Sequence, residues 1–282
     1  MEPTKRARGR PKSLFKESSA GTLQSLDRAL SLLKALASGG DVALSELSRQ
    51  VDIPTATTHR ILNTLQTHGF VQFDSGRQEW SVGVEAYRTG AAFLRRNSVV
   101  EIGQPYLRAL MEQTGETANL AVPDKGEVVF VGQVETPNPI RAFFPAGSRS
   151  SMHASGIGKA ILAAMSDEKR QKLFQKAEFP TFTAHTLIDP MALERDLQQI
   201  RERGWSHDAQ ERYLGMSCIG ACIFDEQANP CAGISVSGPT ARFQDTELER
   251  MGALVVDAAR EITRSSGGRL PHSGKTDLAP KW

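Results

Sequence analysis

Apolar positions along the first third of the chain follow the spacing of helices and then change to the alternation of strands. Leu26 and Leu30 belong to a stripe that repeats every three or four residues, which predicts an amphipathic helix. Gly39-Gly40 after this stripe and Pro54 before the third apolar run are typical of helix boundaries. The predicted helices cover 25–37, 45–51 with Ser45 as the N-cap, and 54–68, and the strands of a hairpin cover 70–73 and 78–82.

Apolar runs in the rest of the chain change between helical and strand periods without a regular alternation. Helices are expected at 84–96, 98–113, 156–165, 167–176, 190–203 and 245–262, and strands at 118–122, 128–134, 141–144, 216–224 and 231–237. This order of elements favours an α+β domain. The helix at 84–96 is expected to link that domain to the preceding helices and hairpin.

The length of 282 residues exceeds one typical domain, so we expect two. A content of 39% hydrophobic and 23% charged residues is ordinary for a soluble globular chain. Neither a run of about 18 apolar residues nor a secretory signal is visible, which predicts a cytoplasmic protein without membrane contact. Cys218, Cys222 and Cys231 lack the spacing of a disulfide framework or a metal site, so we expect reduced thiols, no metal and no cofactor.

Charge is distributed unevenly along the chain. Residues 1–97 contain 14 Lys and Arg against 9 Asp and Glu, and the remainder contains 20 against 23, so the two halves are expected to meet different partners. The basic excess begins in 1–21, a segment that is too poor in apolar residues to fold alone. Its centre around Arg8 and Arg10 resembles an AT-hook, a short arm that lays arginines along a narrow minor groove. A solubilising tail is the alternative interpretation.

The third helix separates into two faces when its residues are placed about 100 degrees apart. Thr58, Ile61, Leu62 and Leu65 share the face that should pack on the first two helices. The opposite side carries short polar side chains of the kind that reach base edges and phosphates in a major groove, where a solvated face would more often show Glu and Lys. The predicted DNA-contacting residues are Thr55, Ala56, Thr57, His59, Arg60 and Asn63, with Arg77 at the hairpin turn as part of a wing.

The stretch Ala-Ser-Gly-Ile-Gly-Lys-Ala-Ile-Leu at 154–162 is similar to a phosphate-binding loop that leads into a helix. A loop of the NTPase type needs glycine at position 153 and Ser or Thr at position 160. His153 and Ala160 stand there instead, which excludes a nucleotide hydrolase. Gly156 and Ile157 can still bind a small anion such as a carboxylate, because the N–H groups at a helix start are unpaired. The alternative is a glycine that serves only close packing.

Motifs in both halves of the chain occur together in the order of a known family. Ile-Pro-Thr-Ala-Thr-Thr-His-Arg-Ile-Leu at 53–62 is followed by Gly-Phe-Val and the hairpin, and further motifs lie at 152–163, 215–225 and 233–239. Over about residues 22–265 the sequence resembles the IclR (isocitrate lyase regulator) family of bacterial transcription factors. The resemblance implies a winged helix-turn-helix domain and a GAF-like effector-binding domain. It also implies a homodimer or dimer of dimers on double-stranded operator DNA under the control of a small metabolite, with RNA polymerase as a further candidate partner.

The resemblance implies an effector pocket by position. The matching residues are Gly156, Ile157, Asp208, Met216, Cys218, Ser235 and Ser237. Asp208 and Cys218 would contact the carbonyl or hydrated end of a small oxo acid, and the amides of 156–157 with the two serines would hold its carboxylate. Independently, serines two apart on a strand point to one face, although this spacing is also typical of a solvated surface. His153 and Lys159 are further pocket candidates by position, although a lysine there can instead extend into solvent.

The small side chains of this set suit a ligand of about two to four carbons, which favours glyoxylate or a similar 2-oxo acid such as pyruvate. Phe143 and Phe144 could enlarge or close the space, so an aromatic acid is the alternative effector. A redox sensor based on the cysteines also stays open, because it depends on thiol exposure and pKa. An enzyme is not expected, since the sequence shows no Ser/His/Asp or Cys/His set.

The expected boundaries of the parts follow from these assignments. They are a basic arm at 1–21, the winged helix-turn-helix domain at 22–83, the linker helix at 84–97, the effector-binding domain at 98–267 and a flexible tail at 268–282. The linker helix around Tyr87 to Leu94 is the expected transmission element, because it joins the pocket domain to the DNA-binding domain.

Overall fold

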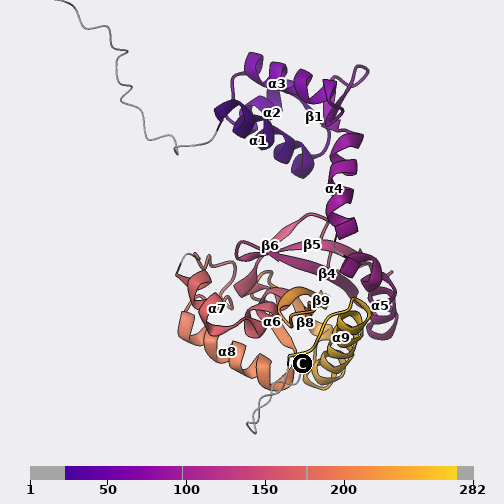
Figure 1. Cartoon of the computed structure of the whole chain (residues 1–282), viewed down its shortest axis with the longest axis vertical. Coiled ribbons are helices and arrows are strands. Elements are labelled where there is room, and N and C mark those ends of the chain that lie inside the picture. Colours follow the sequence, from indigo (N-terminus) through magenta and orange to yellow (C-terminus); the bar gives the residue numbers. More distant parts are fainter. Residues whose placement is uncertain (1–22, 97, 176, 272–282) are drawn as a thin grey trace, which may run out of the picture. The chain divides into compact units, whose positions relative to one another are not determined.

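Three helices pack around a small sheet in the first of two units, Met1–Phe93 and Leu94–Trp282, into which the chain divides (Figure 1). The structure, a computed structural model, describes residues 23–96, 98–175 and 177–271. The first unit contains α1 (Gln24–Gly39), α2 (Leu44–Gln50) and α3 (Thr55–Thr67), with β1 (Val42–Ala43), β2 (Val71–Asp74) and β3 (Glu79–Val82) paired antiparallel in the order β1-β3-β2. Leu36, Leu47, Leu62 and Trp80 are buried in its core.

The start of α2 differs from the sequence prediction. Ser45 is not the N-cap: the helix begins at Leu44, and Ala43 before it makes no side-chain cap hydrogen bond. The physical reason is that Ala43 belongs to β1 and pairs with β3, so the chain enters the helix directly from a strand. Pro54 stands one position before α3, and its carbonyl accepts N–H groups of the first turn.

The second unit is a six-stranded antiparallel sheet with helices on both faces (Figure 1). The sheet has the order β6-β5-β4-β9-β8-β7 within the described residues. Its strands are β4 (Thr117–Asp124), β5 (Glu127–Val134), β6 (Arg149–Ser151), β7 (Ser206–Ala209), β8 (Met216–Phe224) and β9 (Pro230–Pro239). The helices are α4 (Val84–Arg96), which crosses the division between the units, α5 (Ser98–Thr114), α6 (Gly156–Ala164), α7 (Asp167–Phe174), α8 (Pro190–Arg203) and α9 (Asp245–Ser265).

Alternate residues of β8 face the two sides of the sheet. Ile219, Ala221 and Ile223 belong to the apolar core that α5 and α9 cover. Cys222 belongs to the second core, which α6 and α8 cover. This two-residue period places Cys218 and Gly220 under α6, where the predicted effector residues are concentrated.

The strands of the second unit differ from the sequence prediction at 141–144, β6 and β7. Residues 141–144 form no strand: the segment has no ladder partner, and Phe144 instead stacks on Phe130 with ring centroids 4.6 Å apart. The edge position of the sheet is occupied by β6, which pairs with β5. β7 was not predicted, because its inward residues Ser206 and Asp208 are polar and give no apolar alternation.

The α+β class with an N-terminal winged helix-turn-helix unit is confirmed, and the second unit fits the GAF-like architecture that the resemblance implied. None of the helices in the described part of the chain combines the length and the apolar content needed to cross a bilayer.

The core position of Leu62 gives a stability prediction. Leu62→Ala should lower the local free energy of opening of α1–α3 by about 2 to 5 kcal/mol, because it deletes a fully buried side chain. Gln66→Ala, on the exposed side of the same helix, is the matched control and should change it by less than about 0.5 kcal/mol. Amide hydrogen exchange of α3 measures both effects, and equal protection in the two variants would contradict this core assignment.

Candidate DNA-binding face and ligand pocket

One side of α3 is open to solvent. Thr58 and Leu62 are fully buried against the rest of the unit. The predicted contact residues Thr55, Ala56, His59, Arg60 and Asn63 are exposed and Thr57 is half-buried. The structure therefore leaves this set accessible on a recognition-helix surface, and its contact with DNA stays a prediction.

The turn before α3 is fixed by buried polar groups. Ser48 Oγ donates to the carbonyl of Ile53 at 2.6 Å and lies 3.1 Å from Thr55 Oγ1. Thr58 Oγ1 donates to the same carbonyl at 3.3 Å. These bonds hold α2 and α3 at a fixed angle, as a helix-turn-helix requires.

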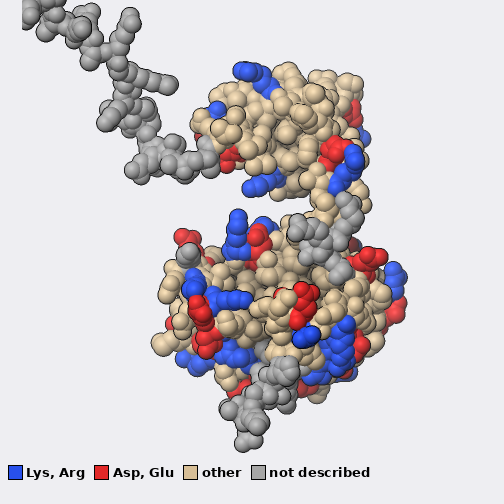
Figure 2. Space-filling model, viewed as in Figure 1, with Lys and Arg blue, Asp and Glu red and all other residues tan. Residues whose placement is uncertain are grey.

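The hairpin between β2 and β3 forms the predicted wing. Asp74 Oδ1 accepts the N–H groups of Gly76 and Arg77, at 2.7 and 3.1 Å. This turn leaves Arg77 exposed. In the view of Figure 2 most of the visible surface of this unit carries no charged side chain, and Lys, Arg, Asp and Glu are scattered over it. The predicted minor-groove residues Arg8 and Arg10 lie outside the described residues.

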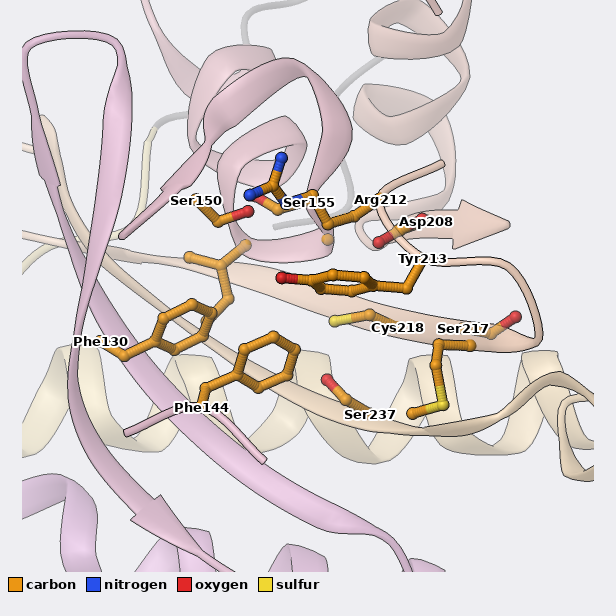
Figure 3. Close-up of a pocket in the computed structure, with 13 residues that line it drawn as sticks. Phe130, Phe144, Ser150, Ser155, Asp208, Arg212, Tyr213, Ser217, Cys218 and Ser237 are labelled. Atoms are coloured by element: carbon orange, nitrogen blue, oxygen red, sulfur yellow. The ribbon is translucent and has the colours of Figure 1, made fainter. Parts of the chain in front are cut away.

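A small pocket opens beside the start of α6 in the second unit (Figure 3). Its lining residues are Phe130, Phe144, Ser150, Ser155, Gly156, Ile157, Asp208, Arg212, Tyr213, Met216, Ser217, Cys218 and Ser237. The volume of the pocket that is open to the centre of a water-sized sphere is about 30 Å³. Six of the seven predicted effector residues thus lie around one cavity, whereas Ser235 is fully buried and does not line it.

Strand register brings the polar members of the lining together. Asp208 on β7 pairs with Cys218 on β8, and Cys218 pairs with Ser237 on β9. Neighbouring strands lie about 4.8 Å apart, so the three side chains form a row across the sheet. Ser237 Oγ accepts a hydrogen bond from Asn119 Nδ2 at 3.2 Å, and its hydroxyl also hydrogen-bonds with the Cys218 sulfur.

Glycines allow the first turn of α6 to lie on this row. A Cβ at Gly156 would come within 2.7 Å of Cys218 Sγ, and a Cβ at Gly220 within 2.8 Å of the Ile157 nitrogen. Ser155 caps the helix by accepting the Gly158 N–H at 3.1 Å. Close packing and the positive end of the helix therefore occur at the same place, and the two interpretations of Gly156 are compatible.

Burial changes the proton affinity of the two groups that the resemblance placed at the effector carbonyl. Burial, with the nearby Glu211 carboxylate, raises the pKa of Asp208 from 3.8 to about 7, although Asp208 Oδ1 accepts the Glu211 N–H at 2.7 Å. Burial, followed by the Asp208 charge, raises the pKa of the Cys218 thiol to about 11. Near neutral pH the pocket therefore holds a neutral thiol and an acid that can keep its proton.

The other cysteines are no more acidic. Burial raises the pKa of Cys222 well above its ordinary value and that of Cys231 to about 11. A redox sensor needs a thiol of low pKa, so these environments disfavour that alternative. Within the described residues, no group of three or more His, Cys, Asp or Glu side chains is arranged to hold a metal ion.

Lys159 neither extends into solvent nor lines the pocket, so neither alternative for this residue holds. Its side chain is 1% exposed, and its Nζ contacts Glu211 Oε1 at 2.5 Å, the His207 carbonyl at 2.6 Å and Asp196 Oδ2 at 2.7 Å. Burial alone would lower the pKa of this ammonium, but the two carboxylates outweigh burial and the pKa is raised. The carboxylates reach Lys159 from α8 and from the segment after β7, and neither contact is visible in the local sequence.

Several lining residues were not predicted. Arg212 and Tyr213 follow Asp208 in an irregular segment, and Ser150 lies on the short edge strand β6. Phe144 lines the pocket, as one alternative allowed, whereas Phe143 is 61% exposed. The sequence feature that could have indicated Arg212 is its position, since it is a cationic residue four positions after Asp208.

The winged helix and the pocket domain together define a two-domain DNA-binding transcriptional regulator. The profile of the IclR helix-turn-helix domain matches residues 25–75, and that of the bacterial transcriptional regulator IclR C-terminal domain matches residues 91–264. The chain belongs to the IclR family.

Relatives of known name and structure agree with this assignment. The chain is 47% identical to the HTH-type transcriptional regulator BhcR of Paracoccus denitrificans over 92% of each protein. It is 42% identical to the transcriptional repressor IclR of Escherichia coli K12, over 95% of this chain and 99% of the relative. The crystal structure of Thermotoga maritima IclR superposes with a TM-score of 0.73 at 28% identity, covering 86% of this chain and 98% of that one.

The raised pKa of Asp208 predicts a pH-dependent stability. The neutral acid favours the folded state, so its contribution is complete below pH 3.8 and is lost as the pH rises to about 7. Asp208→Asn, which cannot ionise, should lack this loss, and its free energy of unfolding relative to the wild type should increase across that window. Urea unfolding of the full chain at several pH values measures the difference, and a constant offset would contradict the assignment.

Proposed function

We propose that this regulator binds operator DNA through α3 and the β2–β3 hairpin, and that a small carboxylate in the pocket changes its DNA affinity. Glyoxylate or a similar 2-oxo acid is the proposed effector. The observation that carries the proposal is the convergence of the α6 start, Asp208, Cys218 and Ser237 on one small cavity.

The chemistry of the lining supports an oxo acid. The N–H groups of Gly156 and Ile157 and the positive end of α6 suit a carboxylate. The neutral form of Asp208 can donate a hydrogen bond to a carbonyl or hydrate oxygen, and the Ser237 hydroxyl can donate one to the carboxylate. The centre of a water-sized sphere can reach only about 30 Å³ of the pocket, which suits a ligand of a few heavy atoms better than an aromatic acid unless the Phe144 or Tyr213 side chain moves.

The ligand can shift the DNA-binding equilibrium only by the difference between its affinities for the two states. We propose α4 as the element that carries this difference, since it crosses the division between the units.

A homodimer or dimer of dimers is proposed as the DNA-binding form. Val84 and Tyr87 on α4 are 67% and 73% exposed, which supports a partner for this helix. RNA polymerase as a partner and the domain boundaries at 22–83, 84–97 and 98–267 stay predictions.

A regulator is also proposed in preference to an enzyme. The relatives named above are a transcriptional regulator and a transcriptional repressor. The pocket thiol is not an activated nucleophile, because its pKa is raised rather than lowered.

Arg60→Ala should weaken operator binding without changing effector affinity. Loss of a base contact costs about 1 to 3 kcal/mol of binding free energy. Loss of a phosphate contact instead reduces the slope of log affinity against log salt concentration by about one. Arg108→Ala removes the same charge from an exposed position on α5 and is the control. Fluorescence anisotropy at several salt concentrations measures both, and equal operator affinities for the two variants would remove Arg60 from the DNA-binding face.

Asp208→Ala should abolish the response of operator binding to glyoxylate while DNA affinity without ligand stays close to that of the wild type. The reason is that the variant removes a pocket group in the unit that does not contain α3. Gel shifts with and without the acid measure the response, and Asp208→Asn preserves the side-chain volume as a companion. Loss of operator binding in both variants would indicate a structural role for Asp208.

A further inference from the structure

Arg212 brings a positive charge into the pocket without a carboxylate partner among the described residues. It lines the cavity, and its Nε is buried with no hydrogen-bond partner. The guanidinium carbon lies 3.7 Å from the centroid of the Phe182 ring and 5.3 Å from that of Tyr213. In the view of Figure 3 the guanidinium points to the side of the pocket where Ser150 and Ser155 lie.

This arrangement differs from that of three other cations in the same unit. Lys159 contacts two carboxylates, Arg170 contacts Glu194 at 2.8 Å, and Arg242 contacts Glu116. A buried donor on a charged group is costly to leave unpaired. Stacking on an aromatic face offsets part of that cost but leaves the edge of the guanidinium, with its N–H groups, available to an anion.

The backbone around Arg212 is held in place before any ligand binds. Glu211 is joined to Lys159 on α6, and the carbonyl of Glu211 accepts from Thr186 Oγ1 at 2.7 Å. The carbonyl of Gln210 accepts from Thr183 Oγ1 at the same distance. Because these bonds fix the backbone of both preceding residues, little backbone entropy is lost when Arg212 pairs with a ligand.

Resting on the proposed function, we propose that Arg212 is a specificity-determining residue, which pairs with the carboxylate of the effector at the start of α6. Tyr213, from the next position, covers the bound acid. The pocket then selects an ionised acid over a neutral molecule of the same shape, because both the helix end and the guanidinium favour negative charge.

Calorimetric titration of the full chain with glyoxylate and with its neutral amide tests this role. Arg212→Gln should weaken glyoxylate binding by about 10- to 100-fold and leave binding of the amide nearly unchanged. Arg212→Lys should recover part of the loss, since it keeps the charge but not the planar stack on Phe182. Arg195→Gln, an exposed arginine on α8 that does not line the pocket, is the matched control and should bind like the wild type.

The outcomes separate this inference from the proposed function. Arg212→Gln that binds glyoxylate as tightly as Arg195→Gln would overturn the role of Arg212 and leave the oxo-acid pocket intact. Equal weakening toward glyoxylate and the amide would assign Arg212 to pocket structure alone, which also overturns the inference. A wild-type chain that binds neither glyoxylate nor pyruvate would contradict the proposed function and this inference together.

Discussion

The close contact between the first turn of α6 and strand β8 is the constraint on which the pocket depends. Two glycines, Gly156 and Gly220, face each other there, and a Cβ on either would collide with the opposite element. Ser206 Oγ completes the contact by donating to the Gly156 carbonyl at 2.6 Å. The helix end therefore lies directly over the row of side chains that β7, β8 and β9 contribute.

A buried ion cluster connects this contact to the segment that closes the pocket. Lys159 lies one turn into α6, and its carboxylate partners Asp196 and Glu211 come from α8 and from the segment after β7. Breaking a buried pair of this kind leaves an uncompensated charge, which is strongly destabilising. The cluster thus ties the helix that offers N–H groups to the segment that carries Arg212, and a ligand between them would contact two elements that are already joined.

Local sequence predicted the elements better than it predicted the environment of single side chains. The stripes of α3 and the apolar runs of β8 and β9 determine their own faces, so those elements were predicted well. β7 escaped prediction because an edge strand that faces a polar pocket carries no apolar alternation. Ser45 did not become a cap because a strand pairing of Ala43 determines where α2 starts. Such contacts join residues that are far apart in the sequence.

In the candidate site too, some features could be predicted from the local sequence and others could not. The helix start at Gly156 could be read from its residues, and Asp208 and Cys218 came from the family resemblance. The burial of Lys159 and the position of Arg212 depend on carboxylates and aromatic rings that other elements supply. A single sequence gives no measure of those distances.

Control of DNA binding by an oxo acid is tested most directly by an anisotropy titration of the purified protein on DNA from its own upstream region, with glyoxylate, pyruvate and acetate compared at a stated salt concentration. An oxo acid should change the specific DNA affinity, and acetate should not. Specific binding that responds to none of these acids would contradict the oxo-acid pocket.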